Sequence, residues 1–357
     1  MENVFRILVI NPGSTSTKIS IYENEAELFR KDIGHSTEEI YAFKIATDQF
    51  VFRKQAIISF LEEIRFDLRR LNAIVARGGA LPPLKAGAYR INQRMLESLI
   101  HRPRADHASN IAALIAFEMT RELGIPSYIY DGISVDQLTD IARISGSPEI
   151  PRLSIIHALN SRSMAQKYAQ SIKKPYSEGT FITAHLGGGI TLSVHHLGQM
   201  IDVISDDEGP FSPERAGKVP CVPLVDLCYS RKYDHITMKK MFRGKGGLLA
   251  YLGTTSALEV EERIATGDQE ALLIYEAMAY QVAKGIGELA TVVKGKVDGI
   301  ILTGGIAYSE MLTRWITERV EFIAPVVIMP GENEMGALAL GALRVLRKEE
   351  TAHEYDL

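Results

Sequence analysis

Three glycine-rich turns stand directly after apolar runs in this sequence, at 12–14, 187–189 and 304–305. Small residues let backbone N–H groups come close to an anion, and a group of such amides favours phosphate. One turn of this kind is usually only a turn, but three of them indicate a nucleotide held by backbone amides. The candidate nucleotide contacts in these turns are Asn11, Gly13, Ser14, Gly187, Gly188, Gly189, Gly304 and Gly305.

The first turn lies in ILVINPGSTSTKISI, which reads as a β-hairpin: an apolar strand, a small-residue turn and an alternating strand. An ordinary hairpin of an antiparallel sheet gives the same pattern, and no GxxxxGK[ST] of a P-loop is present. TFITAHLGGGITLSVHHLGQMID repeats the arrangement, with His185 in the place of Asn11 and Gly187 in that of Gly13. Two such hairpins, each opening one half of the chain, imply a duplicated fold around a shared cleft.

Three basic side chains are candidates for the chemistry. His185 stands at a strand end before the triple glycine, where an imidazole could bind a transferring phosphoryl group; its alternative role is to cap the hairpin. Arg215 lies in the loop segment SPERAG, where its planar fork could clamp a carboxylate or phosphate, although exposed loop arginines are mostly solvated. Arg77 ends a strand before Gly-Gly and could do the same, or form a structural ion pair.

Two acidic side chains are candidates for a metal. Asp131 ends a strand, and Glu334 lies in a loop after one. Either could hold Mg²⁺, which takes one or two protein carboxylates together with phosphate oxygens and water; a simple capping role is as frequent. The sequence lacks HExxH, GxSxG and CxxC, which argues against zinc proteases, α/β-hydrolases and dithiol redox chemistry.

Composition indicates a globular protein. The chain has 357 residues, of which 46% are hydrophobic and 24% charged, and its formal net charge is −4. Since no Lys/Arg cluster stands out, a nucleic acid or an anionic membrane is not an expected partner. No signal peptide or membrane span is recognisable, and the two cysteines, Cys221 and Cys228, are expected to be buried thiols. We therefore expect a cytoplasmic protein.

Strands alternate with helices along the chain, which predicts an α/β class. The helices are expected at 37–65, 107–123, 154–171, 268–294 and 336–347, with Asp106 as a possible N-cap of the second. The polar segment 206–223 contains four prolines and is expected to be an irregular, functional loop. Residues 146–151 combine Ser, Gly and two prolines and are the best linker candidate, so two domains are expected, at 1–150 and 151–335.

The chain resembles the butyrate kinases of the acetokinase family, within the superfamily of acetate and sugar kinases, heat-shock chaperones and actin. The resemblance runs from end to end, and several motifs in the right order form a specific signal. These motifs are NPGSTSTK (11–18), RGG (77–79), HASN (107–110), HLGGGI (185–190), PFSPERAG (210–217), LTGG (302–305) and PGENE (330–334).

This resemblance implies an α/β fold with two duplicated ribonuclease-H-like domains, each with a mixed sheet, and an interdomain nucleotide cleft. The C-terminal helix, at about 336–357, would complete the first domain. The implied reaction converts ATP and a short-chain fatty acid, most simply butyrate, to ADP and an acyl phosphate with Mg²⁺. The family usually forms dimers or larger assemblies, so a homo-oligomer is expected.

Residue roles follow from the same resemblance. His185 and Arg215 would stabilise the transferring phosphoryl group, and Arg77 would face the substrate carboxylate. Asn11, Ser14 and Lys18 belong to the motif near the phosphates, and Asp131 and Glu334 would position Mg²⁺. The family generally carries an Asp and an Arg in the segment after GLL, where this chain has Ser256 and Leu258.

Two alternatives to a butyrate kinase stay open. The same residues would serve a kinase for another small carboxylate, such as acetate, propionate or a branched acid. A nucleotide-binding regulatory relative with reduced turnover would also keep these motifs, and the Ser256 and Leu258 departures leave that reading open.

Overall fold

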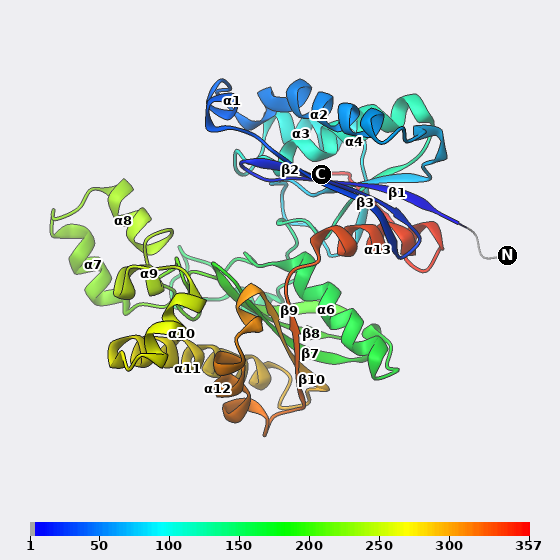
Figure 1. Cartoon of the computed structure of the whole chain (residues 1–357). Coiled ribbons are helices and arrows are strands. Elements are labelled where there is room, and N and C mark those ends of the chain that lie inside the picture. Colours follow the sequence, from blue (N-terminus) through cyan, green and yellow to red (C-terminus); the bar gives the residue numbers. More distant parts are fainter. Residues whose placement is uncertain (1–3) are drawn as a thin grey trace. The chain divides into compact units, whose positions relative to one another are not determined.

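The computed structural model describes residues 4–357 (Figure 1). The chain divides into two compact units. Unit 1 consists of the chain up to Asp136 together with Asn333–Leu357, and unit 2 is Gln137–Glu332. Each unit has its own sheet and its own hydrophobic core.

The sheet of unit 1 has seven strands in the order β12-β5-β6-β4-β1-β2-β3. β1, β2 and β3 form an antiparallel meander, whereas β4 and β6 run parallel to β1. In the β1–β2 hairpin Asn11 lies opposite Lys18, so the hairpin predicted around the first glycine-rich turn is confirmed. The strands are β1 (Arg6–Pro12), β2 (Ser16–Glu23), β3 (Ala26–Gly34), β4 (Ala73–Arg77), β5 (Ala88–Arg90), β6 (Ser127–Tyr130) and β12 (His353–Glu354).

Helices cover both faces of this sheet (Figure 1). Leu8 and Ile10 of β1 belong to the core that also contains α2 and α4, and the alternating residues Ile7 and Val9 are equally buried. Helix α13 contacts β1, β4 and β6, and its Gly341 lies against the ring of Tyr130. The helices are α1 (Thr37–Tyr41), α2 (Phe50–Glu63), α3 (Gln93–His101), α4 (Ser109–Leu123) and α13 (Glu334–Leu346), with 3-10 turns at Ala46–Gln49 and Leu68–Arg70.

The sheet of unit 2 has the order β11-β10-β7-β8-β9 and repeats the arrangement of β6-β4-β1-β2-β3 in unit 1. β7, β8 and β9 form an antiparallel meander, and β10 and β11 run parallel to β7. The predicted α/β class with two mixed sheets and the predicted second hairpin are confirmed. The strands are β7 (Thr180–Leu186), β8 (Ile190–His196), β9 (Gln199–Ile204), β10 (Gly299–Gly304) and β11 (Val326–Pro330).

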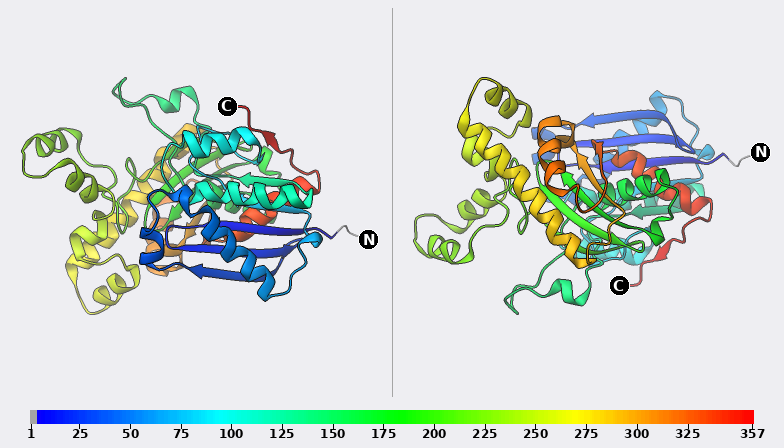
Figure 2. Two further views of the ribbon diagram at one scale, coloured as in Figure 1. Left: turned by 90° about the horizontal axis from the view of Figure 1, so that it is seen from above. Right: turned by 90° about the horizontal axis from the view of Figure 1, so that it is seen from below.

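Alternate residues of β7 face different helices in unit 2. Ile182 and Ala184 pack with α11, whereas Phe181 packs with Met164 and Ala165 of α6. A further group of helices, α7 to α10, precedes α11 along the chain (Figure 2). The helices are α5 (Asp140–Arg143), α6 (Ala158–Ser171), α7 (Cys221–Tyr229), α8 (His235–Phe242), α9 (Gly247–Leu252), α10 (Ala257–Ala265), α11 (Gln269–Val292) and α12 (Glu310–Val320), with 3-10 turns at Tyr176–Glu178 and Gly305–Tyr308.

The first boundary between the units differs from the predicted one at residue 150. The segment after Asp136 belongs to unit 2 because it is bonded to β9: Met200 N donates to Gln137 Oε1 (3.2 Å), and Thr139 N donates to Ile201 O (3.1 Å). The linker composition of 146–151 marks an irregular stretch inside unit 2.

Several local predictions were wrong. The helix expected over 37–65 is interrupted between Tyr41 and Phe50, and Asp106 accepts a bond from Ala46 N instead of capping a helix. Both cysteines are exposed, and Cys221 begins a helix inside the segment expected to be irregular. Pro223 is compatible with this helix because it lies in the first turn, where backbone N–H groups have no helical partner. No helix among residues 4–357 is long and apolar enough to cross a membrane.

Candidate active site

The turn between β1 and β2 borders a hollow of about 420 Å³ in unit 1. Gly13 N donates to Ser16 O (2.8 Å), which closes the turn, and Ser14 and Thr15 are exposed at its tip. Most of the sequence-predicted residues of unit 1 line this hollow. The lining residues are Asn11, Pro12, Gly13, Ser14, Thr15, Ser16, Lys18, Arg77, His107, Ser109 and Glu334.

Glu334 joins two of these residues. Its Oε2 accepts a hydrogen bond from Asn11 Nδ2 (2.8 Å), and its Oε1 forms an ion pair with Arg77 Nη1. The carboxylate is placed by the first turn of α13, where Asn333 Oδ1 caps the helix by accepting from Gly336 N (3.0 Å). The side chains of Arg77 and Glu334 remain 20% and 25% exposed, so both are accessible from the hollow.

His107 and Ser109 also line the hollow, and the sequence prediction did not assign them as site residues. Ser109 N donates to His107 Nδ1 (3.1 Å), so the neutral ring carries its proton on Nε2. Partial burial, and next the charge of Arg77, lower the pKa of His107. The motif HASN therefore starts α4 with a histidine that is neutral near pH 7.

Asp131 has a different setting from Glu334. Its side chain is 3% exposed, and its Oδ1 accepts a hydrogen bond from Gly87 N (2.7 Å). The residue has a φ of 39°, a left-handed conformation that aspartate tolerates better than most residues. Asp131 thus holds the loop before β5 against the end of β6, and it is not among the residues that line the hollow.

His185 is buried in unit 2, at the end of β7, with 1% of its side chain exposed. Asn160 Nδ2 lies 2.9 Å from His185 Nδ1, and because an amide nitrogen only donates, the imidazole proton lies on Nε2. The ring of His157 stacks on that of His185 with centroids 3.8 Å apart. His185 Nε2 lies 3.0 Å from Glu332 Oε1 but makes no hydrogen bond of normal geometry within residues 4–357.

The glycines of unit 2 allow close approaches around this histidine. A Cβ on Gly187 would lie 3.0 Å from His185 Nε2. Gly304 has a φ of +91°, and a Cβ there would lie 2.4 Å from Leu186 O, so β10 can pass the end of β7 only as glycine. Gly305 has open space around its Cβ position and is exposed.

Arg215 lies beside the triple-glycine turn. Ser212 Oγ donates to Gly188 O (2.6 Å) and Glu214 N donates to the same oxygen (3.3 Å), which ties the loop to the turn. The Arg215 guanidinium contacts two carboxylates, Asp206 (Nε to Oδ2, 3.3 Å) and Glu214 (Nη1 to Oε2, 3.3 Å). These distances are long for charge-assisted bonds, so the guanidinium can exchange partners.

Ser256 and Leu258, where this chain departs from the family pattern, lie at the start of α10. Ser256 caps α10 by accepting a bond from Glu259 N (3.2 Å), and Leu258 is 69% exposed. Glu259 accepts from Thr254 Oγ1 (2.6 Å), and Glu261 accepts from the hydroxyl of Tyr275 (2.9 Å). Both acidic neighbours are therefore used in local hydrogen bonds.

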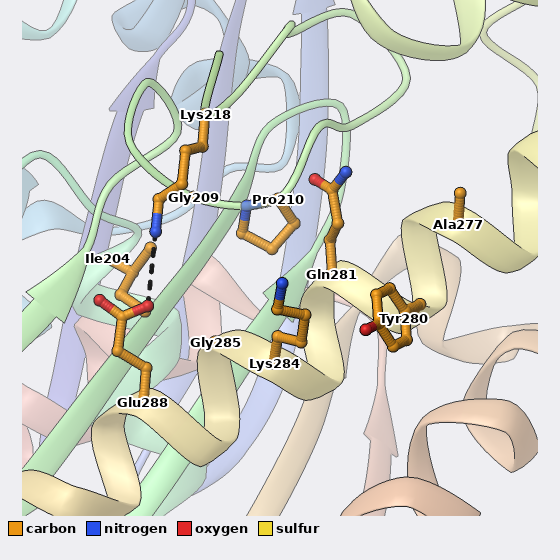
Figure 3. Close-up of a pocket in the computed structure, with 10 residues that line it drawn as sticks. All are labelled: Ile204, Gly209, Pro210, Lys218, Ala277, Tyr280, Gln281, Lys284, Gly285 and Glu288. Atoms are coloured by element: carbon orange, nitrogen blue, oxygen red, sulfur yellow. Dashed lines mark hydrogen bonds and ion pairs between the residues drawn. The ribbon is translucent and has the colours of Figure 1, made fainter. Parts of the chain in front are cut away.

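Another hollow, of about 230 Å³, lies in unit 2, between α11 and the loop that carries Arg215 (Figure 3). Its wall includes Gly209, Pro210 and the aliphatic part of Lys218, whose amine lies 3.5 Å from a carboxylate oxygen of Glu288. None of the sequence-predicted site residues lines it, so it is not part of the candidate active site.

Comparison with known proteins gives the family. Residues 153–329 match the sequence pattern of the acetokinase family. Butyrate kinase 1 of Clostridium acetobutylicum is 49% identical over 354 residues, which cover 99% of this chain and all of that protein. This chain belongs to the acetokinase family. Butyrate kinase 2 of the same organism is 47% identical over 353 residues, covering 98% of this chain and 99% of that protein.

Solved structures of acetate kinases share the fold. An acetate kinase from Porphyromonas gingivalis superposes with a TM-score of 0.77 at 17% identity, over 96% of this chain and 100% of that chain. An acetate kinase from Entamoeba histolytica gives 0.76 at 15% identity, with the same coverage. At these identities the likeness concerns the fold, and it confirms the predicted two-domain α/β architecture.

The structure also adds polar residues that the sequence did not single out. Asn160, His157 and Thr303 surround His185, and Thr303 Oγ1 lies 3.2 Å from Asn160 Nδ2. His157 and Asn160 open α6 as HALN, and a histidine with an asparagine at a helix start was the only signal in the sequence. Within residues 4–357 no group of three or more His, Cys, Asp or Glu side chains is arranged to hold a metal ion.

Proposed function

We propose that this chain catalyses ATP-dependent phosphorylation of a short-chain fatty acid, butyrate first, to an acyl phosphate and ADP. The 49% identity to a butyrate kinase over nearly the whole of both chains carries the proposal. A carboxylic acid has a reference pKa of about 4, so the attacking carboxylate is already ionised at neutral pH and requires no general base. Phosphoryl transfer then depends on positioning and on charge stabilisation.

In this proposal, unit 1 supplies groups that would bind the phosphates of the nucleotide and the carboxylate of the fatty acid. The β1–β2 turn presents small residues and the backbone N–H groups of Ser14 and Thr15 to the hollow, where they would bind phosphate oxygens, with Asn11 and Lys18 beside them. Arg77 would bind the fatty-acid carboxylate through its planar fork after exchanging its contact with Glu334.

Unit 2 supplies the charge-stabilising side chains. His185 carries its proton on Nε2, which lies 3.0 Å from a Glu332 carboxylate oxygen without normal hydrogen-bond geometry, and a phosphoryl oxygen would take the place of that carboxylate. Arg215 is held by long contacts to two carboxylates and can turn toward an anion. The glycines at 187–189 and 304–305 would admit the nucleotide close to the backbone.

Glu334 is the carboxylate that would bind Mg²⁺ in this proposal. This carboxylate faces the hollow, is partly exposed, and is the kind of oxygen ligand that Mg²⁺ takes together with phosphate oxygens and water. When bound, the ion would neutralise charge on the phosphates. Asp131 remains a predicted ligand, although its Oδ1 is already bonded to Gly87 N.

The test is a coupled assay with a panel of acids: acetate, propionate, butyrate and branched acids. Hydroxylamine trapping of the acyl phosphate is the direct readout. Butyrate should give the highest kcat/KM. A higher value for another acid would replace butyrate as the substrate, and ATP binding without any acyl phosphate would favour the regulatory alternative. Assembly into a homo-oligomer stays a prediction.

A further inference from the structure

Arg53 of α2 is a fully buried arginine, with 0% of its side chain exposed. Four N–H groups of its guanidinium donate to neutral oxygens, and none of residues 4–357 supplies a carboxylate that pairs with it. Burial lowers the pKa of Arg53, and no acidic neighbour opposes the shift. A buried charge without a counter-charge is unfavourable and rare, so its presence requires an explanation.

The partners of Arg53 lie in the β1–β2 turn. Its Nη2 donates to Ser14 O (3.0 Å), and its Nη1 donates to Ser16 O (2.8 Å) and to the hydroxyl of Thr17 (3.0 Å). The carbonyl between these two, Thr15 O, accepts from His35 N (2.8 Å). All three carbonyls are thus bonded by groups of the protein.

The amides at the tip of the turn, unlike these carbonyls, have no hydrogen-bond partner in the described part of the chain. Neither Ser14 N nor Thr15 N has a hydrogen-bond acceptor within residues 4–357, and both residues line the 420 Å³ hollow. Because the carbonyls of Ser14, Thr15 and Ser16 are bonded internally and the amides of Ser14 and Thr15 are free, the tip of the turn presents positive partial charges to whatever fills the hollow. The full positive charge of Arg53 lies directly behind the same turn and has the same sign.

We propose that Arg53 is a positioning residue that makes the β1–β2 turn a phosphate site. It fixes the carbonyls of Ser14 and Ser16, and its unpaired charge is compensated when a phosphate group binds at the amides. Arg53 does not touch the ligand in this arrangement; it acts through the turn. The inference rests on the proposed function for the identity of the anion as a phosphate of the nucleotide.

Gln49 allows the charge to be tested without removing Arg53. Its Oε1 accepts from Arg53 Nε (2.8 Å), and the side chain is 7% exposed. Gln49→Glu keeps the shape and this hydrogen bond but places a carboxylate beside the guanidinium. The matched control is Gln55→Glu, which makes the same change at an exposed position of α2.

The measurement is calorimetry of ATP and of adenosine, with thermal unfolding in the absence of ligand. Gln49→Glu should unfold at the wild-type temperature or above, because it gives a buried charge a partner. It should weaken ATP binding by about 10- to 100-fold while adenosine binding stays unchanged. Gln55→Glu should change neither. A folded Gln49→Glu protein that binds ATP as tightly as wild type would overturn the proposal.

A second pair of variants covers the case in which Gln49→Glu does not fold. Arg53→Lys keeps the charge and Arg53→Met removes it, and the ratio of ATP to adenosine affinity is compared in each. The ratio should stay close to wild type in Arg53→Lys and fall in Arg53→Met; equal ratios would overturn the proposal. If wild type makes no acyl phosphate but ATP affinity still depends on Gln49→Glu, the proposed function fails and this inference stands.

Discussion

The orientation of His185 is fixed by residues of α6 and β10. Asn160 donates to Nδ1, so the proton is fixed on Nε2, and the stacked ring of His157 restricts rotation. Asn160 also contacts Thr303 of β10, so three elements hold one imidazole. A side chain held in this way loses little freedom when it binds a phosphoryl oxygen.

His185→Ala and Arg215→Ala are each expected to lower kcat by roughly 10²- to 10³-fold, with a much smaller rise in the KM for ATP. The reason is that both groups stabilise charge that develops in the transition state. Steady-state kinetics with butyrate and ATP measures both constants. Arg243→Ala is the control, because Arg243 shares Asp206 with Arg215 but is 51% exposed; its kcat should stay within a few-fold of wild type.

The sequence predicts candidate site residues that lie within motifs, but not the residues that hold them in place. His185, Arg215 and Glu334 were predicted from their neighbours in the chain. Arg53 and Asn160 were not, because their partners are distant: Ser14 is 39 positions from Arg53, and Thr303 is 143 positions from Asn160. Contacts of that range depend on the sheet order, which no local pattern contains.

At the scale of elements, the ends of β7 and β10 lie close together because residue 304 is a glycine. Leu186 O faces the Cα of Gly304, and Gly304 also exchanges backbone hydrogen bonds with Gly331 (3.3 and 2.9 Å). This packing keeps Thr303 beside Asn160 and so connects the strand ends to the histidine. The backbone conformation at Gly304, φ 91° and ψ 174°, is one that other residues rarely adopt.

Gly304→Ala is expected to lower the free energy of unfolding of unit 2 by about 2 kcal/mol or more, since strain of this kind costs about 1–3 kcal/mol before the clash is added. Gly305→Ala is the neighbouring control and should change it by less than about 1 kcal/mol, because its Cβ position is open. Urea unfolding of the two variants gives the comparison. Equal losses would contradict the role assigned to Gly304.

A second prediction at this scale concerns the start of α10. The double variant Ser256→Asp, Leu258→Arg should bind ADP·Mg²⁺ more tightly, by up to roughly 10- to 150-fold, if it restores a charged contact worth about 1.5–3 kcal/mol. Aspartate also caps helices, so Ser256→Asp preserves the cap that the structure shows. Calorimetry measures the affinity of wild type and of the double variant for ADP·Mg²⁺. Equal or weaker binding by the variant would mean that the segment does not contact the nucleotide.

Element boundaries were harder to predict than element types. One helix is expected over 37–65, yet the chain forms α1, a 3-10 turn and α2. Gln49, at the end of the 3-10 turn, is buried and bonded to Arg53, whose guanidinium is held in turn by Ser14 and Ser16; helix propensity does not include these contacts with a distant segment. Pro223 lies in the segment expected to be irregular, but a proline in the first turn of a helix removes no hydrogen bond, so α7 can form there.

At the scale of the molecule, the two units repeat one topology but have separate cores. The repeat was visible in the sequence because both hairpins carry glycine-rich turns. The boundary at Asp136 was not visible, because composition marks where a chain is irregular and not which sheet it joins. Separate cores mean that the stability of each unit can respond to its own buried groups.

Unit 2 contains a buried polar network that makes its stability depend on pH. His195 is 0% exposed and contacts the hydroxyls of Ser193 (3.0 Å), Thr183 (3.2 Å) and Tyr176 (2.8 Å). Burial, and next the charge of Arg162, lower the pKa of His195 to about 3, from an ordinary value of 6.5. Folded unit 2 therefore keeps this ring neutral at pH values where the unfolded chain protonates it.

The sign of the effect follows from proton binding. Above pH 6.5 both states hold His195 neutral and the residue contributes no pH dependence; between 6.5 and about 3 the unfolded state binds one more proton. The free energy of unfolding should therefore fall with decreasing pH across this window, by up to about 1.4 kcal/mol per pH unit from His195. Urea unfolding of unit 2 between pH 7 and 5, in about half-unit steps, measures the slope. His195→Gln should flatten it, whereas Gln in place of the exposed His101 should leave it unchanged. The same slope in His195→Gln as in wild type would show that other groups, and not His195, take up the proton on unfolding.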